Sequence, residues 1–353
     1  MSKADALDER LAAEEAAPMS AEEGKYYEEA LQSLPADQRQ LFGLIPGDVL
    51  CVVRGFANAK HRKQETLQAI KSISEWRKSV HYYQFFDQQL PGFKQFHDLW
   101  KESIYGPDKY GHMVQCIRIQ DIDTDAIEKM NDQELERLQG QKMKAYAVYK
   151  EDMAKQTGTL RYKHTLLIDL THIKMSMVSS SSKRQALQNI FSIGSKYFPE
   201  TIWKIYLVNG PMVFRAVFAC IKPILAPETI AKINMLGSMD AALKKLEQDG
   251  LPRNVLPEWV GGTSKGKPSF QYVSELIEQR RQHGDGPPGS SYNGQRRGSN
   301  QLHMPMPPPG RTSSQPGMPG TYEQYAAEMQ MQQQMQAMSL SGMGRLSSGP
   351  FPQ

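Results

Sequence analysis

The sequence predicts an α/β fold, with a helical N-terminal module followed by a mixed, mostly parallel sheet. Apolar side chains recur at helical spacing within residues 25–83. From residue 113 onward, short apolar runs alternate with longer helical stripes. Such alternation is typical of parallel strands joined by crossover helices. With 353 residues, of which 39% are hydrophobic, the chain is long enough for one sizeable core with unstructured ends.

The N-terminal region divides into an acidic segment and a helical one. Residues 1–30 carry nine Asp or Glu against three Lys or Arg, a net charge of −6. Residues 1–24 are Ala/Glu-rich and are expected to be disordered. Residues 25–83 are expected to form a helical module, because apolar residues recur at spacings of 3, 3, 3 and 4. These are Leu67, Ile70, Ile73, Trp76 and Val80.

The next segments are assigned in order along the chain. Residues 93–105 are expected to be a helix with Phe96, Leu99 and Trp100 facing inward. Strands are predicted at 113–120 and 164–170, and helices at 131–155 and 183–197. Asn131 and Glu134 form an Asx version of a capping box at the start of the first of these helices.

A strand–helix–strand unit follows at residues 205–237. Residues 205–208 are a short apolar run ended by Asn209-Gly210-Pro211, which predicts a buried strand. A helical stripe covers 212–225, with Pro223 predicting a kink or a loose end. Residues 232–236 are predicted to be the next strand, and Gly237 ends it.

The C-terminal part changes character. Residues 269–283 are expected to hold one last helix. Residues 284–353 contain eleven Gly and ten Pro, with a Met/Gln-rich run at 329–338, and such a composition predicts disorder. This tail is a candidate docking segment for lipid kinases or other proteins.

Several classes of protein are disfavoured by the sequence. The three cysteines are far apart, which fits a reducing compartment and predicts no metal site. No secretory signal, membrane-spanning run or lipidation motif is found. The body outside residues 1–30 carries +10, too dilute for nucleic acid but suited to transient contact with an anionic membrane. No catalytic motif is present, so we expect a cytoplasmic non-enzyme that needs no cofactor.

Six short motifs, in this order and spacing over roughly residues 45–265, resemble the CRAL-TRIO lipid-binding family. They are Gly106-Pro107-Asp108-Lys109-Tyr110-Gly111, Phe198-Pro199-Glu200, Ile205-Tyr206-Leu207-Val208-Asn209-Gly210-Pro211, Lys222-Pro223, residues 229–237 and Leu256-Pro257-Glu258-Trp259-Val260-Gly261-Gly262. The first is similar to the family's turn before its first sheet strand. Yeast-type phosphatidylinositol transfer proteins belong to this family. The resemblance implies that residues 84–268 enclose a hydrophobic lipid cavity.

The resemblance also implies a lid. In the family, the element after the Asn-x-Pro strand covers the cavity, so the segment 212–225 is expected to face lipid or membrane. Its lid and cavity residues are Met212, Val213, Phe214, Val217, Phe218, Ile221 and Leu225. The alternative from the pattern alone is that these are ordinary core residues.

Headgroup residues are implied in the same way. The family's phosphatidylinositol-binding positions fall on Lys60, Glu200, Thr229 and Lys232. Two positions that mark phosphatidylcholine binding fall on His164 and Leu166, and the Arg expected before Lys60 is Ala59. These departures disfavour a choline lipid, and they imply a weaker or altered affinity for the inositol lipid that the resemblance favours.

The sequence as a whole predicts a monomeric lipid-transfer or lipid-sensing protein. It is expected to exchange or present phosphatidylinositol at a membrane, in support of phosphoinositide signalling or membrane trafficking. Two alternatives stay open. One is a carrier of a sterol or of a tocopherol- or retinoid-like molecule. The other is a non-transferring scaffold that binds proteins such as a small GTPase.

Overall fold

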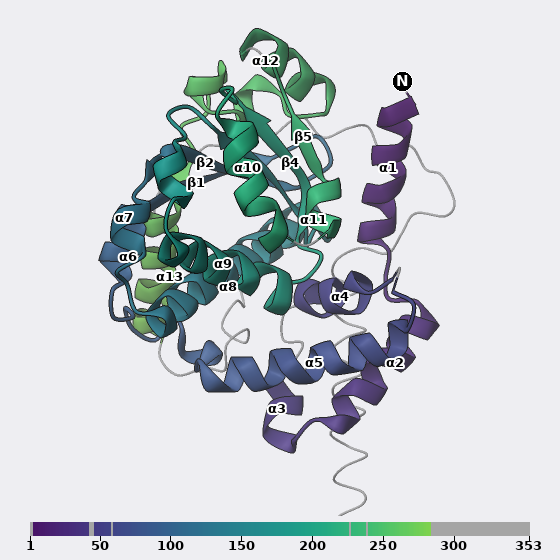
Figure 1. Cartoon of the computed structure of the whole chain (residues 1–353). Coiled ribbons are helices and arrows are strands. Elements are labelled where there is room, and N and C mark those ends of the chain that lie inside the picture. Colours follow the sequence, from purple (N-terminus) through teal and green to yellow (C-terminus); the bar gives the residue numbers. More distant parts are fainter. Residues whose placement is uncertain (1–2, 42–45, 58, 226, 238, 284–353) are drawn as a thin grey trace, which may run out of the picture.

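The computed structural model describes residues 3–41, 46–57, 59–225, 227–237 and 239–283 (Figure 1). The predicted disordered tail, residues 284–353, lies outside this described part of the chain. Within the described ranges, no helix is both long enough and apolar enough to cross a bilayer.

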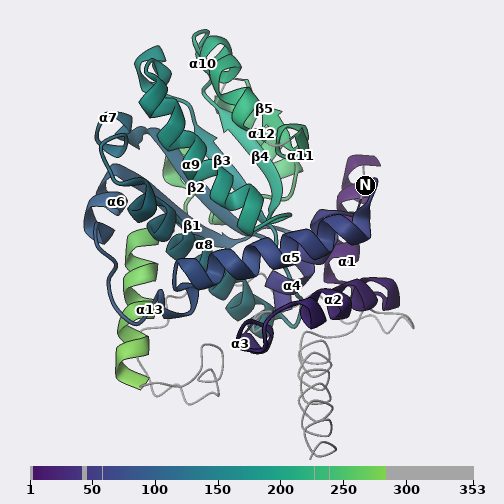
Figure 2. The same cartoon turned by 60° about the horizontal axis from the view of Figure 1, so that its bottom comes forward.

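The N-terminal part of the chain is helical, as predicted for residues 25–83. Its elements are α1 (Lys3–Ala16), α2 (Ala21–Ser33), α3 (Ala36–Leu41), α4 (Pro46–Gly55), α5 (Arg62–Ser79) and the 3-10 turn η1 (Tyr82–Gln84). Ile70 and Ile73 of α5 are fully buried against α2 and α4. Trp76 faces the rest of the molecule and stacks on Tyr197 with ring centroids 4.2 Å apart. Figure 1 shows α5 below the sheet and its covering helices, and Figure 2 shows it alongside α2 and α4.

The expected disorder of residues 1–24 is wrong for the described part of that segment. Residues 3–16 form α1, and Ser20 opens α2 with a capping box, because its side chain and that of Glu23 each accept a backbone amide of the other. Glu15 near the end of α1 is 2% exposed and bonded to distant parts of the chain. Helix α1 is therefore held in place by contacts between buried Glu15 and distant segments, and not by a local pattern of apolar residues.

The sheet is mixed and mostly parallel, as predicted. Its strands are β1 (Trp100–Pro107), β2 (Met113–Ile122), β3 (His164–Asp169), β4 (Ile202–Val208), β5 (Ile233–Met235) and β6 (Lys267–Pro268). They lie in the order β5-β4-β3-β2-β1-β6. Strands β2 to β5 pair in parallel, whereas β1 pairs antiparallel with both β2 and β6. The turn at residues 106–111 therefore joins β1 to β2 and follows a sheet strand, contrary to the expectation.

Helices cover both faces of the sheet (Figure 1). We call the face toward α8 (Asp132–Thr157), α9 (Ser181–Tyr197), α10 (Phe214–Ile221) and α13 (Ser269–His283) the inner face. Ile205 and Leu207 of β4 point to it, and Tyr206 and Val208 point to the outer face. The outer face is covered by α12 (Met239–Gln248) and the turns η4 (Arg253–Val255) and η5 (Glu258–Val260).

Most of the predicted helices and strands are present, but several begin or end at other residues than predicted. The helix expected at 93–105 stops at Leu99 as α6 (Phe93–Leu99), because Trp100 begins β1 and pairs with Ile122. The short helix α7 (Thr124–Ile127) and the turn η2 (Met175–Val178) were not predicted. The helix expected at 212–225 is α10 followed by the turn η3 (Lys222–Ile224), which places Pro223 in the loose end that was predicted. A short helix, α11 (Pro227–Ala231), then leads into β5.

Candidate functional site

Three charged residues meet at the edge of the sheet where the parallel strands begin. Lys163 immediately precedes β3, Glu200 lies two residues before β4, and Lys232 immediately precedes β5. Neighbouring parallel strands start at the same edge, so these side chains gather there. The Nζ of Lys163 lies 2.6 Å from one carboxylate oxygen of Glu200, and the Nζ of Lys232 lies 3.1 Å from the other. We call these three residues the edge cluster.

The edge cluster is half-buried and has an uneven charge. The side chains of Lys163, Glu200 and Lys232 are 16%, 23% and 23% exposed. Burial alone would raise the pKa of Glu200, but the two lysines outweigh burial and hold it below the ordinary value. Burial lowers the pKa of Lys232, Glu200 opposes that effect, and Lys163 adds to it. Two ammonium groups thus share one carboxylate.

The backbone at Glu200 is strained. Its φ is 56°, in the left-handed region that favours glycine. A non-glycine residue held there costs about 1 kcal/mol or more. Such strain persists where the surrounding structure fixes it, and here Pro199 packs against Gly55 at the end of α4. The helical module therefore supports the turn that presents Glu200.

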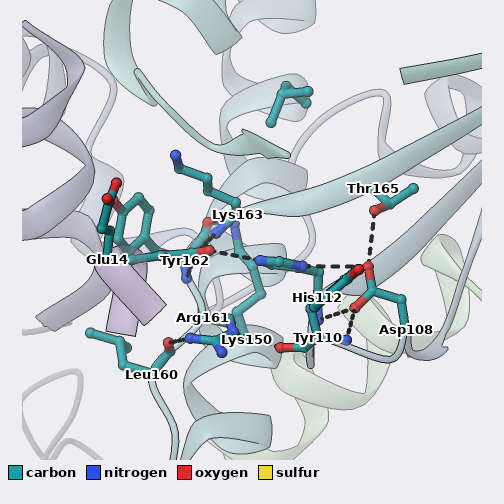
Figure 3. Close-up of polar contacts among 12 residues, drawn as sticks. Glu14, Asp108, Tyr110, His112, Lys150, Leu160, Arg161, Tyr162, Lys163 and Thr165 are labelled. Atoms are coloured by element: carbon teal, nitrogen blue, oxygen red, sulfur yellow. Dashed lines mark hydrogen bonds and ion pairs between the residues drawn. The ribbon is translucent and has the colours of Figure 1, made fainter. Parts of the chain in front are cut away.

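A second charged group lies behind the edge cluster and is fully buried. We call Glu15, His112 and Asp108 the buried triad. His112 Nε2 lies 2.7 Å from Glu15 Oε2, and His112 Nδ1 lies 3.4 Å from Asp108. Figure 3 shows Asp108 in contact with both His112 and Thr165. The ring of His112 also stacks on Trp203 at 4.4 Å.

The pKa shifts within the buried triad follow from close pairing. Burial alone would raise the pKa of Glu15, but His112 and two nearby cations outweigh it and hold the pKa at about 2. Burial alone would lower the pKa of His112, but Glu15 and Asp108 outweigh it and raise the pKa to about 9. Glu15 also accepts the backbone amides of Tyr162 and Lys163, each at 2.8 Å. Lys163 thus joins the two clusters.

The inner face of the sheet is apolar and incompletely covered. Leu166 and Ile168 of β3 are only half-buried, although β3 has a strand on each side. A strand in that position is normally buried on both faces. Half-buried apolar residues around them pack against the same core, and these are Ile202, Ile233, Phe218 and Ile221. The centre of the inner face is therefore not fully covered by the helices that pack on it.

Helix α10 runs beside this part of the inner face (Figure 1). Phe214 and Val217 are buried in the main core, whereas Phe218 and Ile221 are half-buried. Met212, just before α10, is 96% exposed. Val213 and Leu225 are half-buried at either end of the segment. The predicted lid residues therefore fall into a buried row, a partly covered row and one exposed residue.

The predicted headgroup residues are brought together only in part. Glu200 and Lys232 are bonded directly. Thr229 lies in α11, where its carbonyl accepts the backbone amide of Lys232 at 3.1 Å. Lys60 is exposed, and it makes no hydrogen bond or ion pair with another described residue. Lys163 was missed, although it stands immediately before the strand predicted at 164–170.

Metal ligation and thiol chemistry are two further kinds of site to consider in the described residues. Among them, no group of three His, Cys, Asp or Glu side chains is arranged to hold a metal ion. Cys51 and Cys116 are buried free thiols, and burial raises the pKa of each.

Comparisons with known proteins agree with this geometry. Residues 97–262 match the family model described as the CRAL/TRIO domain. The sheet, α10 and the edge cluster all lie in or beside that match. Over these residues, the chain is therefore similar to CRAL/TRIO-domain proteins.

The chain is also similar to several Sec14 cytosolic factors and related transfer proteins. It is 30% identical over 140 residues to the SEC14 cytosolic factor of Kluyveromyces lactis, covering 39% of this chain and 45% of that protein. It is 27% identical over 226 residues to the Sec14 cytosolic factor of Schizosaccharomyces pombe, covering 58% and 73%. A third relative, 25% identical over 206 residues, is the phosphatidylinositol/phosphatidylcholine transfer protein SFH11 of Arabidopsis thaliana, with 54% and 51% covered.

The extent of these matches is limited. The chain matches less than half the length of the first of these relatives. Among solved structures, the crystal structure of Sfh5 is similar with a TM-score of 0.41 and 16% identity, covering 56% of this chain and 69% of that one. That score is too low to transfer any detail from one structure to the other.

Proposed function

We propose that this protein binds a phospholipid in the space between the inner face and α10 and exchanges or presents it at a membrane. The ligand we favour is phosphatidylinositol, and the process served is phosphoinositide signalling or membrane trafficking. In this proposal, residues 84–268 bind the lipid, residues 25–83 support the headgroup turn, and the protein is a non-catalytic cytoplasmic monomer that touches membranes transiently.

The observation that carries the proposal is that Leu166 and Ile168 of β3, in the middle of the sheet, are only half-buried. A diacyl lipid has roughly thirty chain methylenes, each costing about 0.8 kcal/mol in water. A carrier must therefore offer a surface nearly as apolar as the bilayer. Leu166 and Ile168 contribute to such a surface, and their incomplete burial in a central strand has no structural benefit.

The direction of α10 suggests how the lipid lies. Strand β4 ends at Val208, and α10 returns along the inner face toward the edge where β5 begins. The edge cluster lies at that edge, next to α11. Acyl chains beneath α10 would therefore place a headgroup beside Glu200 and Lys232. The lid residues Phe214 and Val217 would separate from the core when α10 opens.

The lipid itself is identified by mass spectrometry of material that copurifies with the full chain, followed by transfer assays between vesicles. Copurified phosphatidylinositol, with transfer of it, is the expected result. A sterol or a tocopherol- or retinoid-like molecule in its place would establish a different ligand. Tight binding of a small GTPase without any lipid transfer would establish a scaffold and overturn the proposal.

Contact with the membrane is tested at Met212, because its exposure separates function from folding. Met212→Asp places an exposed carboxylate just before α10. Transfer between vesicles should fall at least about tenfold, because bringing a charge to hydrocarbon is costly. The melting temperature should stay unchanged, since 96% of the residue is already in water. Met212→Leu is the matched control and should transfer normally. Equal transfer by both variants would refute the lid.

A further inference from the structure

The edge cluster contains one more positive charge than its own residues neutralise. Lys163 and Lys232 are cationic, and Glu200 is the one carboxylate that pairs with either side chain among the described residues. The ammonium of Lys163 also lies 5.7 Å from the ring centre of Tyr162 and 5.8 Å from that of Trp203. These rings limit the approach of water on that side. A half-buried net charge is costly unless an anion compensates it.

The charged neighbours do not remove this excess. Glu15 and Asp108 are already matched by His112 and by Arg161, whose charge acts on both carboxylates. The carboxylate of Glu15 is also occupied by two backbone amides. Lys204, on the neighbouring strand, is paired with Asp8 of α1. Glu15 acts on both lysines from a distance but forms no ion pair with either, so the edge cluster keeps two lysines against one paired carboxylate.

From this geometry we propose that Lys163 and Lys232 together bind one monoanionic phosphodiester, and that Lys163 is a specificity-determining residue of the headgroup site. The inference rests on the proposed function and adds a residue and a charge rule to it. Lys163 stands just before β3. It contacts one carboxylate oxygen of Glu200, and Lys232 contacts the other. A phosphate held between the two ammonium groups would make the site neutral.

The charge rule defines the class of headgroup. A phosphodiester with an uncharged polyol carries one negative charge, which matches the excess. A choline headgroup adds a cation beside the phosphate and leaves the excess in place. Each additional phosphomonoester adds a charge of about −1.5 to −2, which exceeds it. The carboxylate of Glu200 remains available to accept hydroxyl groups of the polyol.

The test uses the full chain and donor vesicles that contain fluorescent-acyl phosphatidylinositol, or fluorescent-acyl diacylglycerol, which lacks phosphate. Lys163→Gln should lower phosphatidylinositol transfer about tenfold, as expected for one charge-assisted contact. Its diacylglycerol transfer should stay within about twofold of wild type. Lys163→Arg keeps the charge and should restore most of the phosphatidylinositol transfer. Lys204→Gln, a neighbouring lysine of similar exposure, should change neither lipid.

The outcomes separate the inference from the function. Wild-type phosphatidylinositol transfer by Lys163→Gln, or an equal loss of both lipids, overturns the role of Lys163 alone. Failure of the wild-type chain to move either lipid overturns the proposed function.

A last experiment adds soluble glycerophosphoinositol as a competitor of phosphatidylinositol transfer. If it competes at millimolar concentration, the site accepts free phosphodiesters as well, and if it does not, the acyl chains are required. Either result sustains the phosphodiester rule once Lys163→Gln has shown its selective loss.

Discussion

The edge cluster and the buried triad share Lys163 but differ in burial and charge balance. The side chains of His112 and Glu15 are 0% exposed, and each charge has a partner. The side chains of the edge cluster are 16–23% exposed, and two cations face one carboxylate. Buried charges that are fully paired can contribute to folding, but they have no charge left to attract a ligand. A partly exposed site with an unpaired positive charge can bind an anionic ligand.

This difference indicates that the two clusters have separate roles at the edge where the parallel strands begin. Through Glu15, the buried triad fixes α1 to the segment 162–163 and so positions the backbone of Lys163. The edge cluster then presents the side chain of Lys163. Mutations in the triad should therefore act first on stability, and mutations in the edge cluster should act first on lipid transfer.

The largest expected effect on stability is that of His112→Ala. This change leaves Glu15 and Asp108 as buried carboxylates without their shared cation, and it removes the ring that stacks on Trp203. The free energy of unfolding, measured with urea, should fall by about 3–5 kcal/mol. His61→Ala is the control, because His61 is exposed and its side chain caps nothing, so it should change stability by less than about 0.5 kcal/mol. A comparably mild effect of His112→Ala would mean that the triad contributes little.

The pH dependence of stability gives the next largest effect. The pKa of His112 is raised on folding from 6.5 to about 9, so its contribution is complete below 6.5 and is lost as the pH rises through 9. The pKa of Glu15 is lowered from 4.5 to about 2, so its contribution is complete above 4.5 and is lost as the pH falls toward 2. Stability from this pair should therefore be greatest between pH 4.5 and 6.5.

Glu15→Gln tests that assignment. The variant keeps an oxygen for the amides of Tyr162 and Lys163 but loses the charge that stabilises protonated His112. It should be about 1–3 kcal/mol less stable near pH 6, and its stability should fall less steeply between pH 6.5 and 9. Urea unfolding at several pH values measures both effects. A slope equal to that of wild type would assign the pH dependence to other groups.

The sequence predicts the strand–helix–strand unit well because its signals are local. Apolar residues 205–208, the Asn209-Gly210-Pro211 stop and the stripe in α10 all lie within a few residues of one another. The end of α6 was misplaced because Trp100 is apolar in either structure, and its pairing with Ile122 decides for the strand. Such pairing is not visible in a local pattern.

The role of α1 could not be predicted from local composition. Glu15 is buried because its partners, His112 and the amides of residues 162–163, come from segments far along the chain. Lys163 was within reach of sequence reasoning. Charged residues at the starts of nearby parallel strands lie at the same edge of a sheet. Lys163 stands just before the strand predicted at 164–170, and Lys232 begins the strand predicted at 232–236.

The smallest expected effect on stability belongs to Glu200→Gly. Glycine adopts the φ of 56° without strain, which is worth about 1 kcal/mol. This gain offsets the greater freedom of the unfolded chain and the loss of two half-buried ion pairs. Unfolding by urea should therefore match wild type within about 0.5 kcal/mol. Glu200→Ala keeps the strain and should be less stable than the glycine variant by about 1 kcal/mol. Both variants should lose phosphatidylinositol transfer, because the carboxylate that orients the two lysines is gone. A loss of more than about 2 kcal/mol in Glu200→Gly would place the edge cluster with the buried triad as a structural feature.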